Sequence, residues 1–326
     1  MNLNPFWYDK NVLITGVSGT LGSALSRELL SPEYGIRRLA GIARKWQPIE
    51  TLQRELDDSR FRPFIGDIRD LDRLQIAFRK VDYIFHAAAL KSVDLCEYNP
   101  SEALATNCLG SQNVLRAALD CGVKRVILVS SDKSCLPQNT YGKTKALSES
   151  LAIAWNSYSG GDGTRFSCAR WGNVVGSSGS VIPLFLRQRE KGKLTITHQK
   201  MTRFWMTIQQ ACKFVIRCMQ EMVGGEIFVP RLPSAPIMQI ASVIAPQAEI
   251  EIVGVRPGEK MHELMIAPDE SWRTRDMGWA YRIAPEYNFW GASYTGGSPV
   301  PSEWAYSSAS AQRLSDDEVG SLISGL

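Results

Sequence analysis

The stretch Asn11-Val12-Leu13-Ile14-Thr15-Gly16-Val17-Ser18-Gly19-Thr20-Leu21-Gly22 decides the fold of this chain. A short apolar run ends in glycines spaced Gly-x-x-Gly-x-x-Gly, and a helix-forming segment follows. Glycine permits the tight turn and lets a pyrophosphate approach the backbone at the positive N-terminus of the helix. The stretch therefore predicts a strand, a dinucleotide-binding loop and a helix start. The loop residues predicted to bind are Gly16, Ser18, Gly19, Thr20, Leu21 and Gly22.

Apolar, β-rich runs alternate with longer amphipathic segments through the first half of the chain, a pattern typical of a parallel sheet with helices on both faces. The predicted strands are Asn11–Thr15, Arg38–Ile42, Phe61–Ile65, Tyr83–His86, Arg125–Ser130 and Phe166–Arg170. The predicted helices are Leu21–Leu30, Leu71–Arg79, Pro100–Cys121 and Tyr141–Tyr158. The predicted fold class is α/β, a doubly wound parallel sheet of the Rossmann type.

The alternating pattern breaks after Gly172, where the glycine- and serine-rich segment Gly172–Ser180 leaves the predicted sheet. We expect a helix at Trp205–Met222, a strand at Glu226–Val229 that rejoins the sheet, and an exposed loop at Gly291–Pro301. Residues 1–172 plus about 205–230 would form the dinucleotide-binding domain. A smaller C-terminal substrate-binding lobe would comprise about 173–204 plus 231–326.

Composition bounds the class of protein. The 326 residues can bury a large core, and 44% hydrophobic and 21% charged residues are typical of a globular enzyme. A net charge of +4 suits a small anionic ligand and argues against a nucleic-acid partner. Seven cysteines without paired spacing predict reduced thiols, no metal site and a cytoplasmic location. The first residues resemble no secretory signal, and no apolar run reaches membrane-spanning length.

The ends of the next strands predict further cofactor contacts. Arg44 and Lys45 stand where an NAD site usually carries an acid, so we expect NADP, whose 2′-phosphate they could bind. The alternative is a solvated basic turn. Asp67 could bond the adenine amine, and the small residues Ala87, Ala88 and Ala89 leave room for the cofactor. His86 could be a ligand but more often such a histidine is packed.

Tyr141 and Lys145 lie one helical turn apart, so both side chains share one face of the predicted helix. A tyrosine with a pKa near ~10 is a poor base unless a cation stabilises its phenolate, which Lys145 can do. Ser131, at the end of the preceding strand, can complete a hydroxyl relay. This set suits removal of a proton from an alcohol while hydride passes to a nicotinamide.

Asp132 and Lys133 place an acid and a base side by side between the strand and the tyrosine. Removal of water next to a new ketone needs both groups. A lysine with a pKa near ~10.4 must have it lowered by burial or by neighbouring cations to act as a base. The alternative is an exposed Asp-Lys turn. Together the two pairs predict a nucleotide-sugar dehydratase.

A series of motifs follows in order along nearly the whole chain: Phe64–Asp67, His86–Lys91, Cys96–Pro100, Ser131–Lys133, Asn139–Gly142, Gly172–Ser177, Met201–Trp205, Gly225–Pro230, Arg256–Lys260 and Tyr306–Ser308. In these motifs the chain resembles the inverting UDP-N-acetylglucosamine 4,6-dehydratases of the extended short-chain dehydrogenase/reductase superfamily. The resemblance implies an NADP-dependent hydro-lyase that begins pseudaminic-acid-type bacterial sugar pathways. It also implies a homo-oligomer, either a hexamer or a dimer.

The resemblance assigns the reaction steps. Tyr141, with Ser131 and Lys145, would oxidise the sugar at C4, Lys133 would remove the C5 proton, and Asp132 would protonate the departing C6 hydroxyl. Hydride would return to C6, and C5 would be reprotonated from the opposite face. The product would be UDP-2-acetamido-2,6-dideoxy-beta-L-arabino-hex-4-ulose, with tightly bound NADP regenerated in each cycle.

The resemblance also implies binding residues. Further cofactor contacts would come from Ile68, Asn107 and Val174, in addition to Tyr141 and Lys145. The UDP-sugar would be held by Lys91, Asn173, Val181, Thr197, Met201, Arg256 and Glu259. The chain departs from the usual family residues at Ser92, Asp94, Trp171 and His198–Lys200. These departures leave the tolerated sugar substituent open.

Three alternatives remain at this point. A nucleotide-sugar 4-epimerase shares the serine, tyrosine and lysine but needs no acid–base pair, so Asp132 and Lys133 count against it. A configuration-retaining dehydratase differs only in the face on which C5 is protonated, which sequence hardly determines. A non-enzymatic NADP-binding scaffold would be expected to carry a broken loop or catalytic pair, and both are intact.

Overall fold

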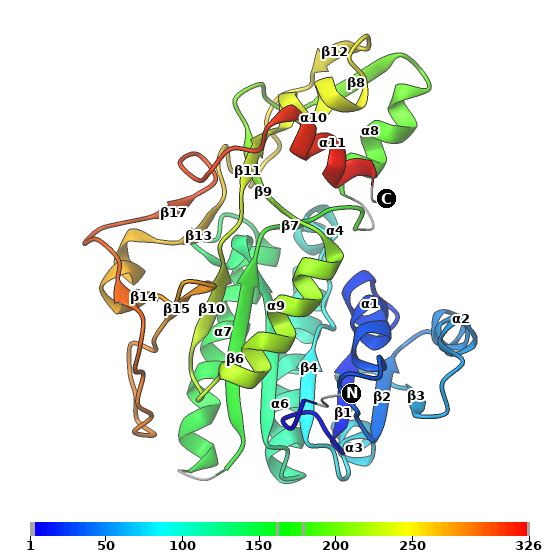
Figure 1. The fold of residues 1–326 in the computed structure, drawn as a ribbon, viewed down its shortest axis with the longest axis vertical. Coiled ribbons are helices and arrows are strands. Elements are labelled where there is room, and N and C mark those ends of the chain that lie inside the picture. Colours follow the sequence, from blue (N-terminus) through cyan, green and yellow to red (C-terminus); the bar gives the residue numbers. More distant parts are fainter. Residues whose placement is uncertain (1–3, 161–162, 178–179, 325–326) are drawn as a thin grey trace.

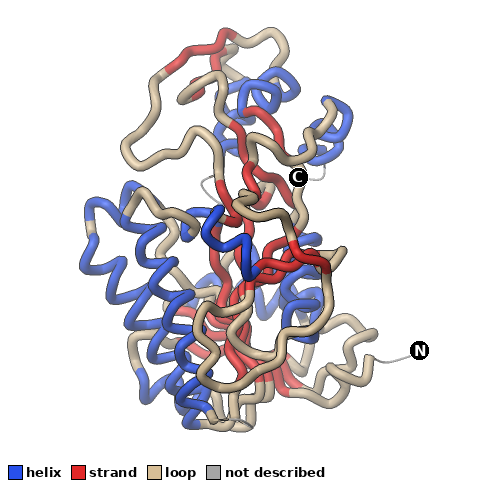
Figure 2. Tube along the Cα trace, turned by 90° about the vertical axis from the view of Figure 1, so that its left-hand side faces the viewer, coloured by secondary structure: helices blue, strands red, loops and turns tan. Residues whose placement is uncertain are grey.

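The computed structural model describes residues 4–160, 163–177 and 180–324, and the parts of the predicted ranges that fall at residues 1–3, 161–162, 178–179 and 325–326 lie outside it. A large sheet runs through the lower part of the molecule, with helices on both of its faces (Figures 1 and 2). Its strand order is β16-β14-β15-β10-β6-β5-β4-β1-β2-β3. A smaller lobe stands above the sheet at the end where the glycine-rich loop lies (Figure 1).

The strands from β3 to β10 run parallel and form the classical nucleotide-binding order around β1. They are β1 (Asn11–Thr15), β2 (Arg38–Ala43), β3 (Phe61–Ile65), β4 (Tyr83–His86), β5 (Arg125–Ser131), β6 (Arg165–Trp171) and β10 (Ile227–Pro230). Most of them are nearly continuous apolar runs because helices cover both faces. The predicted α/β, doubly wound fold and its strands are confirmed.

The helices around this sheet are α1 (Thr20–Leu29), α2 (Trp46–Leu56), α3 (Leu71–Ala77), α4 (Val93–Tyr98), α5 (Pro100–Ala103), α6 (Gly110–Asp120), α7 (Thr140–Ser159) and α9 (Ile208–Glu221). A π-helical turn, Leu104–Leu109, joins α5 to α6, so the predicted helix Pro100–Cys121 is continuous but irregular. The sequence analysis missed α2 and α4. Helix α4 has only six residues, too few for a clear helical period, whereas α2 has eleven residues but buries only Ile49 and Leu52.

The helix predicted at Trp205–Met222 begins later than expected. Trp205 and Met206 are the buried end of strand β9 (Thr202–Met206). Thr207 then caps α9: its hydroxyl accepts from the Gln210 amide, and the Gln210 side chain accepts from the Thr207 amide. This capping box fixes the start of the helix one residue after the strand.

The small lobe has its own apolar core, which includes Phe185, Leu194 and Trp205. Its elements are β7 (Asn173–Val174), α8 (Val181–Arg189), β8 (Lys193–Ile196), β9, β11 (Ser234–Pro236), α10 (Ile237–Ile244), β12 (Glu249–Ile252) and α11 (Asp316–Ser324). The chain leaves the main sheet after Gly172, as predicted. The rest of the lobe is assembled from segments that are far apart in sequence (Figure 1).

One range differs from the predicted domain division. The segment contains β13 (Leu264–Ile266), a short helical stretch (Pro268–Arg273), β14 (Thr274–Asp276), β15 (Ala280–Ile283), β16 (Ser298–Pro299) and β17 (Tyr306–Ser307). The sequence-based division places all of it in the small lobe. Strand β15 instead pairs antiparallel with β10, and β14 and β16 follow it, so these strands widen the main sheet. Gly291–Pro301 is largely exposed, as predicted, although Ser298 and Pro299 pair with β14.

Within the described part of the chain, no helix combines the length and the apolar character needed to cross a bilayer.

Candidate active site

The glycine loop between β1 and α1 packs so closely against neighbouring backbone that a side chain would clash at Gly16 and at Gly22. Gly16 has a φ of +70°, and a Cβ there would lie 2.8 Å from the Ala88 amide nitrogen. A Cβ on Gly22 would lie 2.6 Å from the Val17 Cα. No side chain caps α1, because its N-cap residue is Gly19. The amides of the first turn are therefore available to an anion, as the dinucleotide prediction requires.

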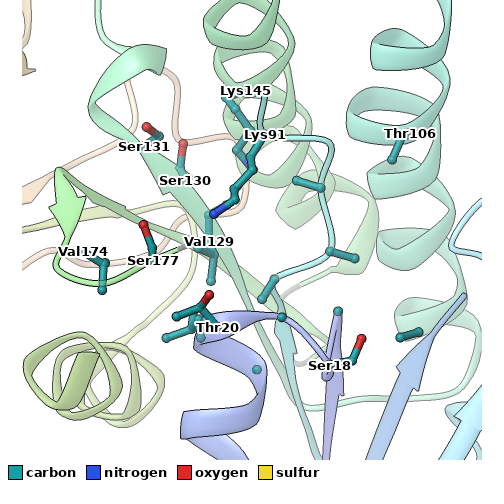
Figure 3. Close-up of a pocket in the computed structure, with 18 of the residues that line it drawn as sticks. Ser18, Thr20, Lys91, Thr106, Val129, Ser130, Ser131, Lys145, Val174 and Ser177 are labelled. Carbon is teal, nitrogen blue, oxygen red and sulfur yellow. The ribbon is translucent and has the colours of Figure 1, made fainter. Parts of the chain in front are cut away.

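A cavity of about 540 Å³ lies against this loop, at the carboxyl ends of β1, β2, β4 and β5. Figure 3 shows Ser18 and Thr20 on one side of it and Val174 and Ser177 on another. Except for Asn107, every residue predicted to bind the cofactor lines this cavity. The lining predicted residues are Gly16, Ser18, Gly19, Thr20, Leu21, Gly22, Arg44, Lys45, Asp67, Ile68, Ala87, Ala88, Ala89, Tyr141, Lys145 and Val174. The arrangement fits a dinucleotide.

The structure places the Asn107 side chain behind the wall of this cavity. Its Oδ1 accepts from the Leu90 amide at 2.7 Å, and its Nδ2 donates to the Leu90 carbonyl at 2.9 Å and to the Thr144 hydroxyl at 3.0 Å. The side chain is buried in the π-helical turn and does not line the cavity. Asn107 therefore holds the segment after β4 in place, and its contact with the cofactor stays a prediction.

His86 is packed in the core, as the commoner of its two interpretations expected. Its Nδ1 lies 2.7 Å from the Thr15 hydroxyl and its Nε2 lies 2.9 Å from the Ser111 hydroxyl. Burial lowers the pKa of His86 to about 3, so the ring is neutral. It supports the glycine loop and takes no part in the cavity wall.

The positive side chains predicted for a 2′-phosphate lie at the cavity. Arg44 and Lys45 follow β2 and line it together with Asp67. Burial alone would raise the pKa of Asp67, but hydrogen bonds and the charge of Arg69, 2.7 Å away, hold it below its usual value. The Asp67 carboxylate is therefore charged and paired with Arg69, and the charge of Arg44 also acts on it. Strand β2 itself carries no acid beside Arg44 and Lys45.

Asp132 and Lys133 lie in a single 3-10 turn between β5 and α7. The Asp132 side chain is 1% exposed, and that of Lys133 is 26% exposed. Asp132 Oδ1 accepts from the Ser131 hydroxyl at 2.8 Å and from Lys133 Nζ at 3.1 Å. The alternative of an exposed Asp-Lys turn is therefore wrong. Both residues line the cavity beside Tyr141 and Lys145.

The charges around this pair support one expected role and correct the other. Burial raises the pKa of Asp132, which favours the protonated form that a general acid needs. For Lys133, we expected a lowered pKa. Burial acts in that direction, but the carboxylates of Asp132 and Glu263 outweigh it and raise the pKa above its usual value. Lys133 is an ammonium in this state.

Tyr141 and Lys145 lie on α7 where the spacing placed them, and both are buried at the cavity. Burial raises the pKa of Tyr141 to about 12, while the charge of Lys133 and a hydrogen bond with Ser131 act against the rise. Lys145 Nζ donates to the Val129 carbonyl at 2.6 Å, and burial lowers the pKa of Lys145. Lys133 and Ser131 are thus the two neighbours of Tyr141 that promote loss of its proton.

A second cavity, of about 440 Å³, lies between the main sheet and the small lobe. It shares Lys91, Lys133, Asn173 and Ser177 with the first cavity, so the two adjoin at Lys133. The predicted substrate residues that line it are Lys91, Asn173, Val181, Thr197, Arg256 and Glu259.

Met201 is the predicted substrate residue that does not line this cavity. It is fully buried in the core of the small lobe, and its sulfur contacts the Thr197 hydroxyl at 3.0 Å and Arg203 Nη2 at 3.4 Å. Met201 therefore supports the wall from behind, and its contact with the substrate stays a prediction.

Sequence reasoning missed two charged residues next to the catalytic turn. Glu263 Oε1 lies 3.4 Å from Lys133 Nζ and 3.7 Å from Arg203 Nε. Arg203 Nη2 in turn contacts Glu259 Oε1 at 3.0 Å. No spacing rule connects a residue of β9 with the loop before β13, so only the fold brings them together.

The seven cysteines are free, and the described residues contain no group of three or more His, Cys, Asp or Glu side chains that could hold a metal ion.

Comparison with known proteins places the chain in a family. Residues 12–285 match the family described as polysaccharide biosynthesis protein. A UDP-N-acetylglucosamine 4,6-dehydratase (inverting) from Campylobacter jejuni is 43% identical over 85% of this chain and 83% of its own length. A UDP-glucose 4-epimerase from Rickettsia bellii is 36% identical over 98% of this chain and 96% of its own length.

A solved dTDP-glucose 4,6-dehydratase from Streptomyces venezuelae, with NAD bound, superimposes with a TM-score of 0.71. It is 25% identical in sequence, and the match covers 77% of this chain and 86% of that one. The likeness agrees with the observed parallel sheet and glycine loop. The chain therefore belongs to the polysaccharide biosynthesis protein family of extended short-chain dehydrogenase/reductases, which includes the inverting UDP-N-acetylglucosamine 4,6-dehydratases.

Proposed function

We propose that this protein is a UDP-N-acetylglucosamine 4,6-dehydratase that inverts C5 and uses NADP. The observation that carries the proposal is the contact of 3.1 Å between Asp132 and Lys133, within the same cavity wall as Ser131, Tyr141 and Lys145. Oxidation at C4 needs only Ser131, Tyr141 and Lys145. Loss of water also needs Asp132 and Lys133.

The residues divide the work by position. Tyr141, assisted by Ser131 and by nearby positive charge, takes the proton from the C4 hydroxyl. Transfer of a proton from Lys133 Nζ to Asp132 Oδ1, 3.1 Å away, leaves a neutral amine and a protonated carboxyl. The Lys133 amine then takes the C5 proton, and Asp132 gives its proton to the C6 hydroxyl, which departs as water. The nicotinamide, when bound, supplies the chemistry of accepting hydride from C4 and returning it to C6. A proton delivered to the opposite face of C5 completes the inverted 4-keto-6-deoxy sugar.

The second cavity supports a UDP-sugar as the substrate. Lys91 and Arg256 supply positive charge there for a diphosphate. Burial lowers the pKa of Lys91. Because the cavity adjoins the first one at Lys133, a sugar nucleotide lying in it can present its hexose to the catalytic turn. An assignment to a pseudaminic-acid-type pathway, a cytoplasmic location and a hexameric or dimeric homo-oligomer rest on the family resemblance and stay predictions.

Incubation with UDP-N-acetylglucosamine in heavy water tests the reaction, with the product followed by NMR and mass spectrometry. We expect loss of water, deuterium at C5 and the L-arabino configuration. Retained configuration at C5 would favour a retaining dehydratase. A galacto product without loss of mass would favour the 4-epimerase function that the Rickettsia relative bears in its name.

Cofactor choice is tested separately. Arg44 and Lys45 line the cavity where a 2′-phosphate would lie, so we expect tighter binding of NADP than of NAD. The double substitution of Arg44 and Lys45 by alanine should remove that preference while leaving NAD binding unchanged. Calorimetric titration of both proteins with both cofactors measures this, and equal or tighter NAD binding to the unaltered protein would refute it.

A further inference from the structure

A buried cluster of charges joins the small lobe to the catalytic turn. Lys133 Nζ contacts Asp132 Oδ1 at 3.1 Å on its own turn and Glu263 Oε1 at 3.4 Å on the loop before β13. The Glu263 side chain is 3% exposed, and the guanidinium of Arg203 lies behind it at 3.7 Å. The catalytic lysine is therefore shared between two carboxylates, one on its own turn and one on the loop before β13.

Each carboxylate contacts Lys133 through one oxygen. The other oxygens, Asp132 Oδ2 and Glu263 Oε2, are buried without a hydrogen-bond partner. A partly satisfied buried cluster costs stability, and natural proteins carry such costs mainly at functional sites. Asp132 lines the cavity of the glycine loop and Glu263 lines the second cavity, so the cluster lies where the two adjoin.

The same segment of the small lobe holds the turn at further points. Lys260 Nζ donates to the Cys135 carbonyl at the end of the turn. Asn139, the N-cap of α7, donates from Nδ2 to the Gly258 carbonyl at 2.9 Å. These contacts fix the backbone of the turn, whereas Glu263 contacts the reactive amine itself. Unlike Gly258 and Lys260, Glu263 can therefore act on the position and the protonation of the Lys133 amine.

We infer that Glu263 is a positioning residue for the proton transfers at C5: held by Arg203, it shares the Lys133 amine with Asp132, fixes that amine where the cavities adjoin, and sets the pH at which it gives up its proton. This inference rests on the proposed function. The charged groups that act on the amine are Asp132 on its own turn, Arg203 on β9 and Glu263, and Tyr141 on α7 also faces it.

Glu263→Gln tests the inference because it removes the charge and keeps the shape. The Lys133 amine is then drawn toward Asp132. Displacement of a reacting group by about 1 Å can cost about 10²-fold in rate, so we expect water loss to slow by that order. Tyr141 and Lys145 have no contact with Glu263, so oxidation at C4 should continue and reduced nicotinamide should accumulate in the absorbance spectrum.

The pH profile provides the second measurement. A negative charge beside an ammonium opposes loss of its proton, so Glu263→Gln should move the rising limb of the rate of water loss to lower pH. Glu263→Asp withdraws the charge by one methylene and should give the same changes with smaller size. Glu270→Gln is the matched control, since Glu270 is a buried carboxylate of the same segment that pairs with Arg170 and does not contact Lys133.

The outcomes separate the two levels of the argument. If the wild type releases no water from UDP-N-acetylglucosamine, the proposed function is wrong and the inference falls with it. If the wild type dehydrates and both Glu263 variants share its rate and pH profile, the inference alone is wrong. It is also wrong if Glu270→Gln shows the same slowing and the same shift. Thermal unfolding of each variant confirms the fold, and Glu263→Asp decides if Glu263→Gln does not fold.

Discussion

Substitution of Gly22 by alanine should weaken cofactor binding by an amount that the structure allows to be estimated. A methyl group on Gly22 would lie 2.6 Å from the Val17 Cα, which is 0.8 Å short of the 3.4 Å at which ordinary contact begins. The Val17 Cα and the still nearer Gly16 carbonyl oxygen both belong to the backbone, so neither can turn aside. The N-terminal turn of α1 must move away from the loop by about that distance, and overpacking of this kind typically costs about 1–3 kcal/mol.

This displacement should weaken cofactor binding, because the amides of that turn would face the cofactor diphosphate. The free protein can relax by moving α1, whereas the bound protein needs the turn in its original place. If the full cost falls on binding, the Kd for NADP rises by about 5- to 150-fold, since 1.4 kcal/mol corresponds to tenfold.

Calorimetric titration of the wild type and Gly22→Ala with NADP measures the effect. Gly320→Ala is the control, because Gly320 lies in α11 and a Cβ there meets no atom within 4 Å. We expect the control to bind NADP like the wild type and to unfold at the same or a slightly higher temperature. Unchanged affinity in Gly22→Ala would refute the close packing of the loop against α1.

Three further predictions follow from the site and its supports. Lys133→Ala should slow water loss by about 10²- to 10⁴-fold, because that is the usual contribution of a general base. NADP binding should stay unchanged. Substantial turnover of this variant in a water-release assay would show that Lys133 is not the base. Tyr141→Phe should abolish oxidation at C4, so that no reduced nicotinamide appears on mixing with substrate, and its appearance would contradict the proton transfer. Arg170→Met should cost about 3–5 kcal/mol of unfolding free energy at neutral pH, since it strands the buried carboxylates of Glu149 and Glu270, which Arg170 contacts at 2.7 and 2.9 Å. Urea unfolding should show that cost shrinking as pH falls toward about 4.3, the ordinary pKa of glutamate, and a constant cost would contradict it.

The pKa of the Glu270 carboxyl explains why the stability cost of Arg170→Met should shrink as pH falls. Burial acts to raise its pKa, but the charge and hydrogen bonds of Arg170 hold it below its usual value. In the wild type, this pairing contributes stability above the unfolded pKa, and the contribution is lost as pH falls through the folded pKa. Without Arg170, burial dominates and raises the folded pKa. Proton uptake in the folded state then recovers stability on acidification.

Local patterns predicted the parallel sheet and the cofactor wall. Most of the strands are contiguous apolar runs. The glycine loop, the alanines after β4 and the residues of the catalytic turn each follow a strand of that sheet. The carboxyl ends of parallel strands share one edge, so residues predicted one by one came together in one cavity. Tyr141 and Lys145 needed only the period of a helix.

Features that depend on distant segments could not be predicted in this way. Trp205 and Met206 are apolar and precede a helix, so their own pattern does not distinguish the end of a buried strand from a first helical turn. Lys133 has an acid beside it in sequence, but the second carboxylate that raises its pKa is Glu263, which only the small lobe brings near. Asn107 has a residue type suited to a cofactor contact, yet the π-helical turn directs it to Leu90.

The separation of Lys133 from Glu263 along the chain affects how the protein is made. The two residues are 130 positions apart, so at about 5–20 residues per second a ribosome needs about 7–26 seconds to pass from one to the other. Most of the wall of the first cavity is synthesised before that interval begins. We therefore expect the nascent chain to assemble its oxidation site first and to gain the second counter-ion of its dehydrating lysine only late in synthesis.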